Sequence, residues 1–345
     1  MANIYDVAKQ AKVSIATVSK VLSNTPYVSV TTRERVLQVV QALDYTPSLA
    51  ARALTGTRTY IVGLVIPYDP NYLFRDPFLM EEIRGVDDAV TSHDYNLLLS
   101  TASRSPAVNQ TNQQSAYARL LRTGYADGAI TFETFEGDAP AHQLETAGLP
   151  RVSIGYAGQQ AVSNVVHSDD YAGSLEVVRY LLQLGHRRIG VVSGPPNFMQ
   201  AMNERLRGYQ HALTAYQLRF DQQLVTYGDF TSESGYMAAG QLLALQPRPT
   251  AIFAMNDRMA IGVMRRAQEM GLLIPADLSV VGFDDVPLSV AIDPPLTTVG
   301  QNAFVMGHTA ATLLFNLIEN PTKTFDSVVL PTELIIRGST APLVG

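Results

Sequence analysis

The chemistry that stands out in this sequence lies between residues 13 and 22, at helical spacing. Three apolar residues share one face of this segment: Val18, Val21 and Leu22. The opposite face carries short side chains and one cation: Ile15, Ala16, Ser19 and Lys20. Such a face suits the major groove of DNA, where apolar groups contact thymine methyl groups and lysine reaches guanine acceptors. We therefore interpret residues 13–22 as the recognition helix of a helix-turn-helix.

No pattern typical of catalysis accompanies this segment. The sequence has no Gly-x-Ser-x-Gly elbow, Walker loop, dinucleotide fingerprint or His-Glu-x-x-His motif. Its six histidines are scattered without metal-ligand spacing, and it has no cysteine, which excludes disulfides, thiolate metal sites and cysteine nucleophiles. We expect no enzyme, no catalytic residue, no bound metal and no cofactor.

Length and composition indicate several domains outside the membrane. The 345 residues, of which 46% are hydrophobic, are enough for two or three domains with sizeable cores. No apolar run approaches the length of about eighteen residues that a membrane span needs. The N-terminus lacks a charged region followed by an apolar one, so it is not a secretory signal. We expect a cytoplasmic protein.

The charge is unevenly distributed along the chain. The formal net charge is −6, but residues 1–59 carry +4, which leaves −10 for the remainder. A small DNA-reading head on an acidic body would produce this asymmetry. A chance fluctuation in a short window would produce it as well.

Three short helices are expected to position the recognition residues. Asn3 can cap the first helix, Ser14 the second, and Thr31 with Glu34 forms a capping box for the third. The first and third helices also have apolar faces that can meet in a core: Ile4, Val7, Ala8 and Ala11, and Val36, Val39, Val40 and Leu43. A bundle this small that still presents an orderly polar face is typical of a binding module.

A possible fourth helix follows at residues 48–55. Pro47 ends the preceding helix, Ser48 can cap the next one, and Gly56 can end it. A helix this short does not hold alone in water. It would need a partner, such as a second copy of itself on DNA; the alternative is an ordinary linker.

Two linked stretches resemble the LacI/GalR family of bacterial transcription regulators. The run 5–19 resembles the family's DNA-binding head, and the run 45–54 resembles its hinge helix. The resemblance implies a homodimer on a near-palindromic operator, with Leu54 of each hinge wedged into the minor groove. Ile15, Ala16 and Lys20 correspond to the sequence-reading positions. The full set of expected DNA-binding residues is Ser14, Ile15, Ala16, Thr17, Ser19, Lys20, Ala51, Arg52 and Leu54.

The remaining chain alternates between strand and helix patterns, which predicts βαβ units and parallel sheets. Two such series indicate two α/β lobes with a cleft between them, where ligands sit at the carboxyl ends of strands. The expected strands are 61–66, 96–100, 127–131, 151–154, 188–193, 251–254 and 278–282. The expected helices are 79–91, 110–122, 139–147 and 171–184.

The body also resembles the same family, which carries a periplasmic-binding-protein-like pair of lobes. The supporting runs are 184–190, 204–209, 254–262, 279–285 and 294–299. The resemblance implies crossings between the lobes near Val162, Asp293 and Thr322. We thus expect a head over 1–46, a hinge over 47–59 and a body over 60–345. The first lobe would span about 60–161 and 294–321, and the second about 162–293 and 322–345.

The resemblance further implies an effector site in the cleft. Arg205 and Asp284 fall where the family holds its effector, and their chemistry suits the hydroxyls of a sugar. The alternative for this pair is a structural ion pair, and Phe230 could serve only as packing. The full set of expected effector-binding residues is Phe78, Glu133, Arg205, Phe230, Asn256, Asp284 and Gln301.

The segment 67–78 is longer than the family's usual loop. Its Tyr72 and Phe74 either extend the cleft floor or cover the lobe surface; we favour the surface.

The resemblance as a whole predicts a LacI-type transcriptional repressor controlled by a small molecule, most simply a sugar. Two alternatives remain: a sugar-binding transport receptor, and a regulator that responds to a nucleoside or a sugar phosphate.

Overall fold

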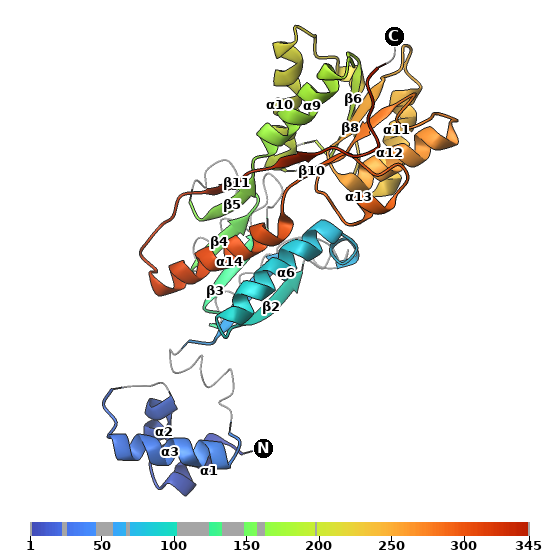
Figure 1. The fold of residues 1–345 in the computed structure, drawn as a ribbon. Coiled ribbons are helices and arrows are strands. Elements are labelled where there is room, and N and C mark those ends of the chain that lie inside the picture. The colour runs from blue at the N-terminus through green and yellow to red at the C-terminus, as the bar shows by residue number, and fades with distance from the viewer. Residues whose placement is uncertain are drawn as a thin grey trace, which may run out of the picture.

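The computed structural model shows three N-terminal helices followed by two α/β lobes (Figure 1). It describes residues 2–22, 26–45, 58–66, 70–101, 124–132, 148–156, 163–196 and 199–343. Residues 47–57 of the expected hinge, with Ala51, Arg52 and Leu54, lie outside the described residues, as do Glu133 and the expected helices 110–122 and 139–147.

The head consists of α1 (Ile4–Ala11), α2 (Ile15–Leu22) and α3 (Val30–Ala42). Apolar residues at helical spacing bring the three helices together around one small core, as the sequence predicts. Its buried members are Val7, Ala8, Ala11, Val18, Val21, Val36 and Tyr45. Asn3 caps α1 in a capping box with Asp6, and the Ser14 hydroxyl accepts from the Thr17 amide at the start of α2.

The capping box predicted at Thr31 is wrong. The helix α3 begins at Val30 with Ser29 as its N-cap, two residues earlier than a cap at Thr31 would place it. The Ser29 hydroxyl accepts from the Thr32 amide at 3.3 Å, so Thr31 already lies in the first turn. A serine and two threonines follow one another closely here, and any of them can cap a helix, so the sequence alone did not decide between them.

The first lobe is built on a six-stranded sheet with the order β11-β5-β4-β3-β1-β2, in which neighbouring strands pair in parallel. The strands are β1 (Ile61–Ile66), β2 (Asn96–Thr101), β3 (Gly128–Phe132), β4 (Arg151–Ile154), β5 (Val165–Ser168) and β11 (Val328–Leu330). The continuous apolar run of β1 is buried throughout, as expected for a central parallel strand.

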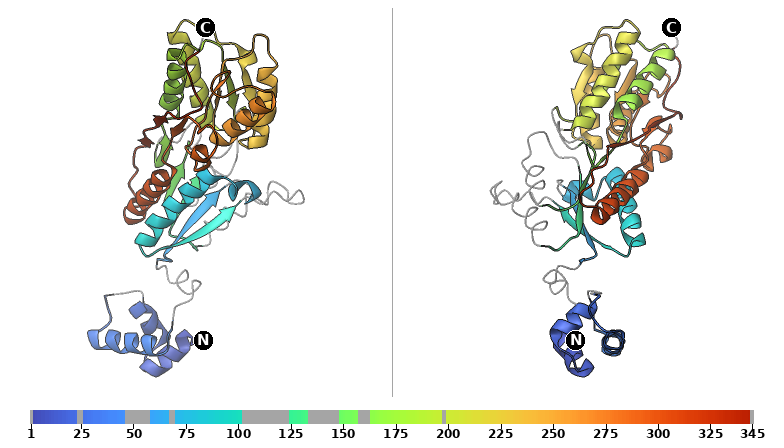
Figure 2. Two further views of the ribbon diagram at one scale, coloured as in Figure 1. Left: turned by 45° about the vertical axis from the view of Figure 1, so that its right-hand side comes forward. Right: turned by 90° about the vertical axis from the view of Figure 1, so that its left-hand side faces the viewer.

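Two helices, α6 (Pro77–Ser92) and α14 (Ala303–Glu319), lie side by side and pack on this sheet (Figures 1 and 2). Glycines allow the two backbones to approach closely. A Cβ atom at Gly85 would collide with the Phe304 carbonyl oxygen, and one at Gly307 would collide with that of Glu82. The short helix α5 (Pro70–Leu73) precedes α6.

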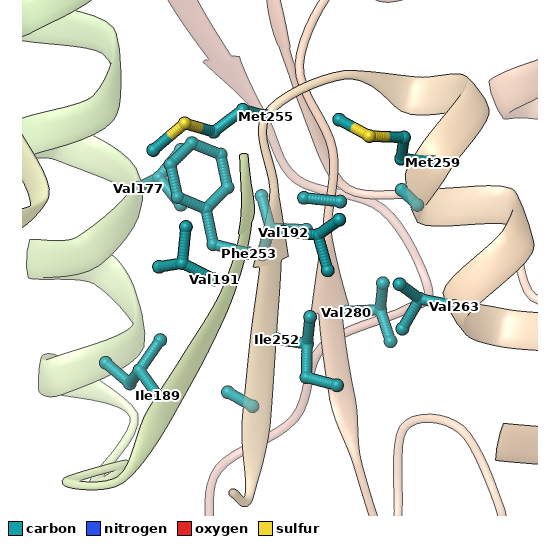
Figure 3. Packing of buried hydrophobic residues seen from close by; sticks show 14 of the residues in the cluster. Val177, Ile189, Val191, Val192, Ile252, Phe253, Met255, Met259, Val263 and Val280 are labelled. Carbon is teal, nitrogen blue, oxygen red and sulfur yellow. The ribbon is translucent and has the colours of Figure 1, made fainter. Parts of the chain in front are cut away.

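The second lobe has a four-stranded parallel sheet with the order β7-β6-β8-β9. Figure 3 shows its core, in which Phe253 points towards Val177 while Ile252 and Val280 pack on the other face of the sheet. The strands are β6 (Ile189–Ser193), β7 (Val225–Tyr227), β8 (Ala251–Ala254) and β9 (Ser279–Val281). The helices are α9 (Asp170–Gln183), α10 (Gln200–Ala215), α11 (Ser232–Leu243), α12 (Asp257–Glu269) and α13 (Leu288–Ala291), with the 3-10 turn η1 (Gln222–Leu224).

The chain crosses between the lobes later than expected at all three points. β5 pairs with β4 in the first sheet, so the first crossing follows Ser168 rather than Val162. Thr297 bridges to β9, and β10 (Thr298–Gly300) pairs with β12 (Glu333–Ile335), so the second crossing follows Gly300 rather than Asp293. β11 pairs with β5, so the third follows Leu330 rather than Thr322. The resemblance implied these crossings without showing which sheet each neighbouring strand joins, and the strand pairing places all three later.

The strands expected from the sequence are all present within the described residues, with shifts of one residue or so at their ends. The helices expected over 79–91 and 171–184 are α6 and α9. Within the described residues, no helix is long and apolar enough to cross a membrane.

Candidate DNA-reading surface and effector cavity

The outward face of α2 carries the residues that the sequence marked for DNA. Ile15, Ala16 and Lys20 are exposed, while Thr17 and Ser19 are half-buried. Ser14 and Thr17 lie at the start of the helix with their hydroxyl oxygens 2.9 Å apart. On the opposite face Val18 and Val21 are buried in the head core. The two faces of this helix are therefore divided as predicted.

A cavity of about 360 Å³ lies between the two lobes. Both lobes line it, and the carboxyl ends of strands β3, β4, β5 and β8 open onto it. Six of the seven predicted effector residues line this cavity: Phe78, Arg205, Phe230, Asn256, Asp284 and Gln301. The residues that the family resemblance marked thus come together from six separate segments of the chain.

Arg205, on α10, is almost fully buried, with 6% of its side chain exposed, and it has contacts on several sides. Its Nε donates to Asp170 Oδ1 at 2.7 Å, and its Nη1 donates to the carbonyl oxygen of Met255. The guanidinium lies 3.7 Å from the centroid of the Phe283 ring, within the range of a cation–π contact. These contacts hold the planar group in one orientation at the cavity wall.

Asp284 follows β9 and lies 3.9 Å from Arg205, measured from Oδ1 to Nη1. Its φ of 123° is unfavourable for a residue with a side chain, and such strain is concentrated at functional sites. Gln301 donates to the same carboxylate oxygen at 2.6 Å. Burial raises the pKa of Asp284 well above its usual range, and the nearby Asp257 and Asp76 add to the rise, while Arg205 opposes it.

Asp170 is the residue of this cluster that the sequence analysis missed. It is 3% exposed, lies in the first turn of α9 just after β5, and gives Arg205 its closest ion-pair partner. Burial raises the pKa of its carboxyl, and the Arg205 guanidinium opposes that rise. The position directly after a strand was the available signal, but residues 165–168, which form β5, are not among the strands expected from the sequence.

Asn256 and Phe230 are linked to each other at the second-lobe wall. The Asn256 side chain accepts from the Met259 amide as N-cap of α12, and its Nδ2 donates to the Phe230 carbonyl at 3.2 Å. Phe230 is 9% exposed and has a φ of 67°. The amide of Asn256 therefore holds the loop that carries Phe230 against the cavity.

The first lobe contributes a largely apolar wall. Phe78, Leu79 and Phe132 line it together with Met306 from α14. Tyr72 lines the cavity too, so our preference for a surface position is wrong for this residue. Phe74 is 59% exposed, as expected. The sequence pattern alone could not separate these two aromatics because they belong to the same short segment.

Carboxylates outnumber cations around the cavity. The lining acids are Asp76, Glu82, Asp170, Asp229 and Asp284, whereas Arg205 is the only lysine or arginine among the described lining residues. Rigid guanidinium donors next to carboxylate acceptors suit neighbouring hydroxyl groups, which both donate and accept. In the part of the chain that the structure describes, no group of three or more His, Asp or Glu side chains is arranged to hold a metal ion.

A small helical head followed by two lobes with a cavity between them suits a DNA-binding protein that a ligand controls. The family model for bacterial regulatory proteins of the lacI family matches residues 3–48, and that for a periplasmic binding protein-like domain matches residues 178–340. The HTH-type transcriptional repressor CytR of Escherichia coli (strain K12) is 34% identical over 343 residues, covering 99% of this chain and 97% of that protein.

Two solved structures extend the similarity to three dimensions. The complex of the transcriptional regulator CelR with cellobiose has a TM-score of 0.76 at 32% identity, covering 98% of this chain and 100% of that chain. The lac repressor dimer bound to operator and the anti-inducer ONPF has a TM-score of 0.82 at 28% identity, covering 99% of both chains. The chain belongs to the LacI family and is a DNA-binding transcriptional regulator.

Proposed function

We propose that this chain is a homodimeric repressor whose paired heads bind a near-palindromic operator and whose cavity binds an uncharged, polyhydroxylated effector. The observation that carries the effector part is the buried group of Arg205, Asp170, Asp284 and Gln301 at the wall of an interlobe cavity. The similarity to an operator-bound dimer supports the DNA part.

We assign base reading to Ile15, Ala16 and Lys20. Ile15 and Ala16 offer apolar contacts to thymine methyl groups, and Lys20 offers a donor to guanine. Their exposure on α2 supports this role. We assign contacts near the phosphates to Ser14, Thr17 and Ser19. Ala51, Arg52 and Leu54, outside the described residues, complete the proposed interface as minor-groove contacts.

We assign the effector hydroxyls to Arg205 and Asp284, with Gln301 and Asn256 as further polar groups and Phe78 and Phe230 as the surfaces that pack on the ligand. Glu133 remains a candidate outside the described residues. The lining disfavours a sugar phosphate, because Arg205 is the only lysine or arginine among the described lining residues and is already paired with Asp170. A sugar, or the sugar part of a nucleoside, satisfies the same group without a further cation.

A thermal-shift screen of the full chain tests the effector class directly. The panel pairs ribose with ribose 5-phosphate, glucose with glucose 6-phosphate and cytidine with its monophosphate, and adds cellobiose. A ligand at 100 times its Kd adds about 2.7 kcal/mol to stability, which shifts the Tm by several degrees. We expect stabilisation by an uncharged compound and less by its phosphate. Preference for the phosphorylated member of a pair would contradict the proposal.

The DNA part is tested by selecting binding sites from random duplexes and by measuring the mass of the free chain. We expect an enriched sequence with two-fold symmetry and a dimer at micromolar concentration. A single asymmetric half-site, or a strict monomer, would refute the homodimeric arrangement.

Control of DNA binding by the cavity is tested with the compound that stabilises the chain in the thermal-shift screen. This compound should change operator affinity, and a compound that binds without any such change would show that the cavity does not control DNA binding.

A further inference from the structure

Tyr72, on α5 in the first lobe, contacts both lobes. Its ring packs against the apolar core of the first lobe and also against that of the second. It lines the effector cavity as well. Burial raises the pKa of its phenol, so the hydroxyl keeps its proton. Tyr72 is therefore a neutral side chain placed where the two lobes and the cavity meet.

Four residues further along, Asp76 connects the lobes through charge. Its Oδ1 accepts from the Phe78 and Leu79 amides as N-cap of α6, at 3.0 and 3.4 Å. Its Oδ2 accepts from Arg258 Nη1 at 2.9 Å. Arg258 belongs to the first turn of α12, in the second lobe. One carboxylate thus joins the start of a first-lobe helix to the start of a second-lobe helix.

The surroundings of this ion pair favour a strong interaction. Only 7% of the Asp76 side chain and 19% of the Arg258 side chain are exposed, so solvent screens the pair less than it screens a surface pair. The Arg258 guanidinium also lies 5.6 Å from the centroid of the Tyr72 ring. Removing one partner of such a pair leaves the other charge uncompensated, which is why single substitutions are informative.

We propose that Tyr72, Asp76 and Arg258 form an interlobe clasp that holds the two walls of the cavity at a fixed separation. Phe78, on the first-lobe wall of the cavity, follows Asp76 by two residues, and Asn256, on the second-lobe wall, is the N-cap of the helix that carries Arg258. The clasp therefore keeps these two walls facing each other. Asp76 and Arg258 are positioning residues in this role, and Tyr72 packs against the apolar cores of both lobes beside them. The proposal rests on the proposed function in that it takes this cavity as the effector site.

The test measures the distance between the lobes, so it needs neither DNA nor a known ligand. The chain has no cysteine, so Asn316→Cys on α14 and Met237→Cys on α11 create two specific sites for nitroxide labels. Pulsed dipolar spectroscopy then reports the distance between the labels. An excess of unlabelled chain restricts the signal to pairs within one subunit.

Substitutions at the ion pair decide the proposal. Asp76→Asn retains an oxygen that can cap α6 but removes the charge, and Arg258→Gln removes the other partner. We expect each to lengthen or broaden the distance distribution, and the double substitution to add little to either. Arg258→Lys, which keeps the charge, should restore most of the original distribution. Unchanged distributions in both single variants would overturn the clasp.

Matched controls separate the clasp from general loss of order. Arg265→Gln removes an exposed ion pair from the same helix α12, but its partner Glu233 lies in the second lobe, so this pair does not cross the cavity. Tyr72→Ala should broaden the distribution, whereas Phe74→Ala, at the exposed aromatic of the same segment, should not. Equal broadening in the clasp and control variants would refute the assignment. Failure of the effector screen with these distances as expected would reject the proposed function alone.

Discussion

The two recognition surfaces of this chain are built in opposite ways. The outward face of α2 carries short, exposed side chains, and the head beneath it has a core of only a few buried residues. The interlobe cavity instead holds its polar groups almost fully buried, and each has several partners within the protein. The first surface depends on DNA to order its contacts, whereas the second is arranged before any ligand arrives.

This difference follows from the size of the two units. A bundle of three short helices buries too little surface to fix long polar side chains, so it presents small ones. In the proposed homodimer, phosphate contacts and the second head supply the remaining affinity. The body has two sheets with covering helices, and its strands end at the cavity. The body can therefore bury charged side chains, because neighbouring polar groups form hydrogen bonds and ion pairs with them and offset the cost of removing them from water.

The largest effect should come from breaking the preorganised surface at Arg205. Arg205→Ala leaves Asp170 and Asp284 buried without their cation, which should destabilise the body by about 3–5 kcal/mol. It should also abolish the effector response while operator binding largely persists, since the head is built separately. Urea unfolding and operator titrations with and without effector measure the two consequences.

Arg265→Ala is the matched control for Arg205→Ala. It breaks an ion pair of the same lobe whose two side chains are 48% and 71% exposed, so solvent screens the pair and its loss should change stability very little. Equal losses in the two variants would mean that the Arg205 contacts are no more fixed than those at the surface. A normal effector response in Arg205→Ala would remove Arg205 from the effector site.

The same difference explains how much the sequence could predict. In the head, helical spacing alone separated the buried Val18 and Val21 from the exposed Lys20, because a short helix has one inward face. In the body, strand patterns predicted the sheets, and the family resemblance identified six residues that line the cavity. Asp170 and Tyr72 were not predicted as site residues, because their roles depend on where the chain crosses between lobes and on contacts with distant segments.

The second prediction concerns the exposed face of α2, which we propose reads the DNA bases. Lys20→Ala should relax base preference at one position of each operator half-site, with a loss of about 1–3 kcal/mol of discrimination there. The side chains of Ile15 and Ala16 offer no hydrogen bonds, so under the proposed assignment Lys20 carries most of the polar reading on this helix face. Binding-site selection with each variant measures the preference position by position.

Lys12→Ala is a suitable control for Lys20→Ala, because Lys12 is also exposed but lies at the end of α1, outside the recognition helix. It should weaken binding to all sequences about equally, as the loss of a general electrostatic contribution does. If Lys20→Ala behaves in the same way, its role is electrostatic and the base-reading assignment fails.

The smallest effect tests how the head itself is held together. Ser29→Ala removes the side-chain acceptor for the Thr32 amide at the start of α3 and should cost about 1 kcal/mol of head stability. Thr31→Ala, two residues along and already inside the helix, should cost much less, although the sequence alone had favoured Thr31 as the cap. Thermal unfolding of the head, followed by amide hydrogen exchange at α3, compares the two. If Thr31→Ala proves the more damaging, α3 begins at Thr32 in solution, and the small head adjusts its helix ends more freely than the buried cavity adjusts its contacts.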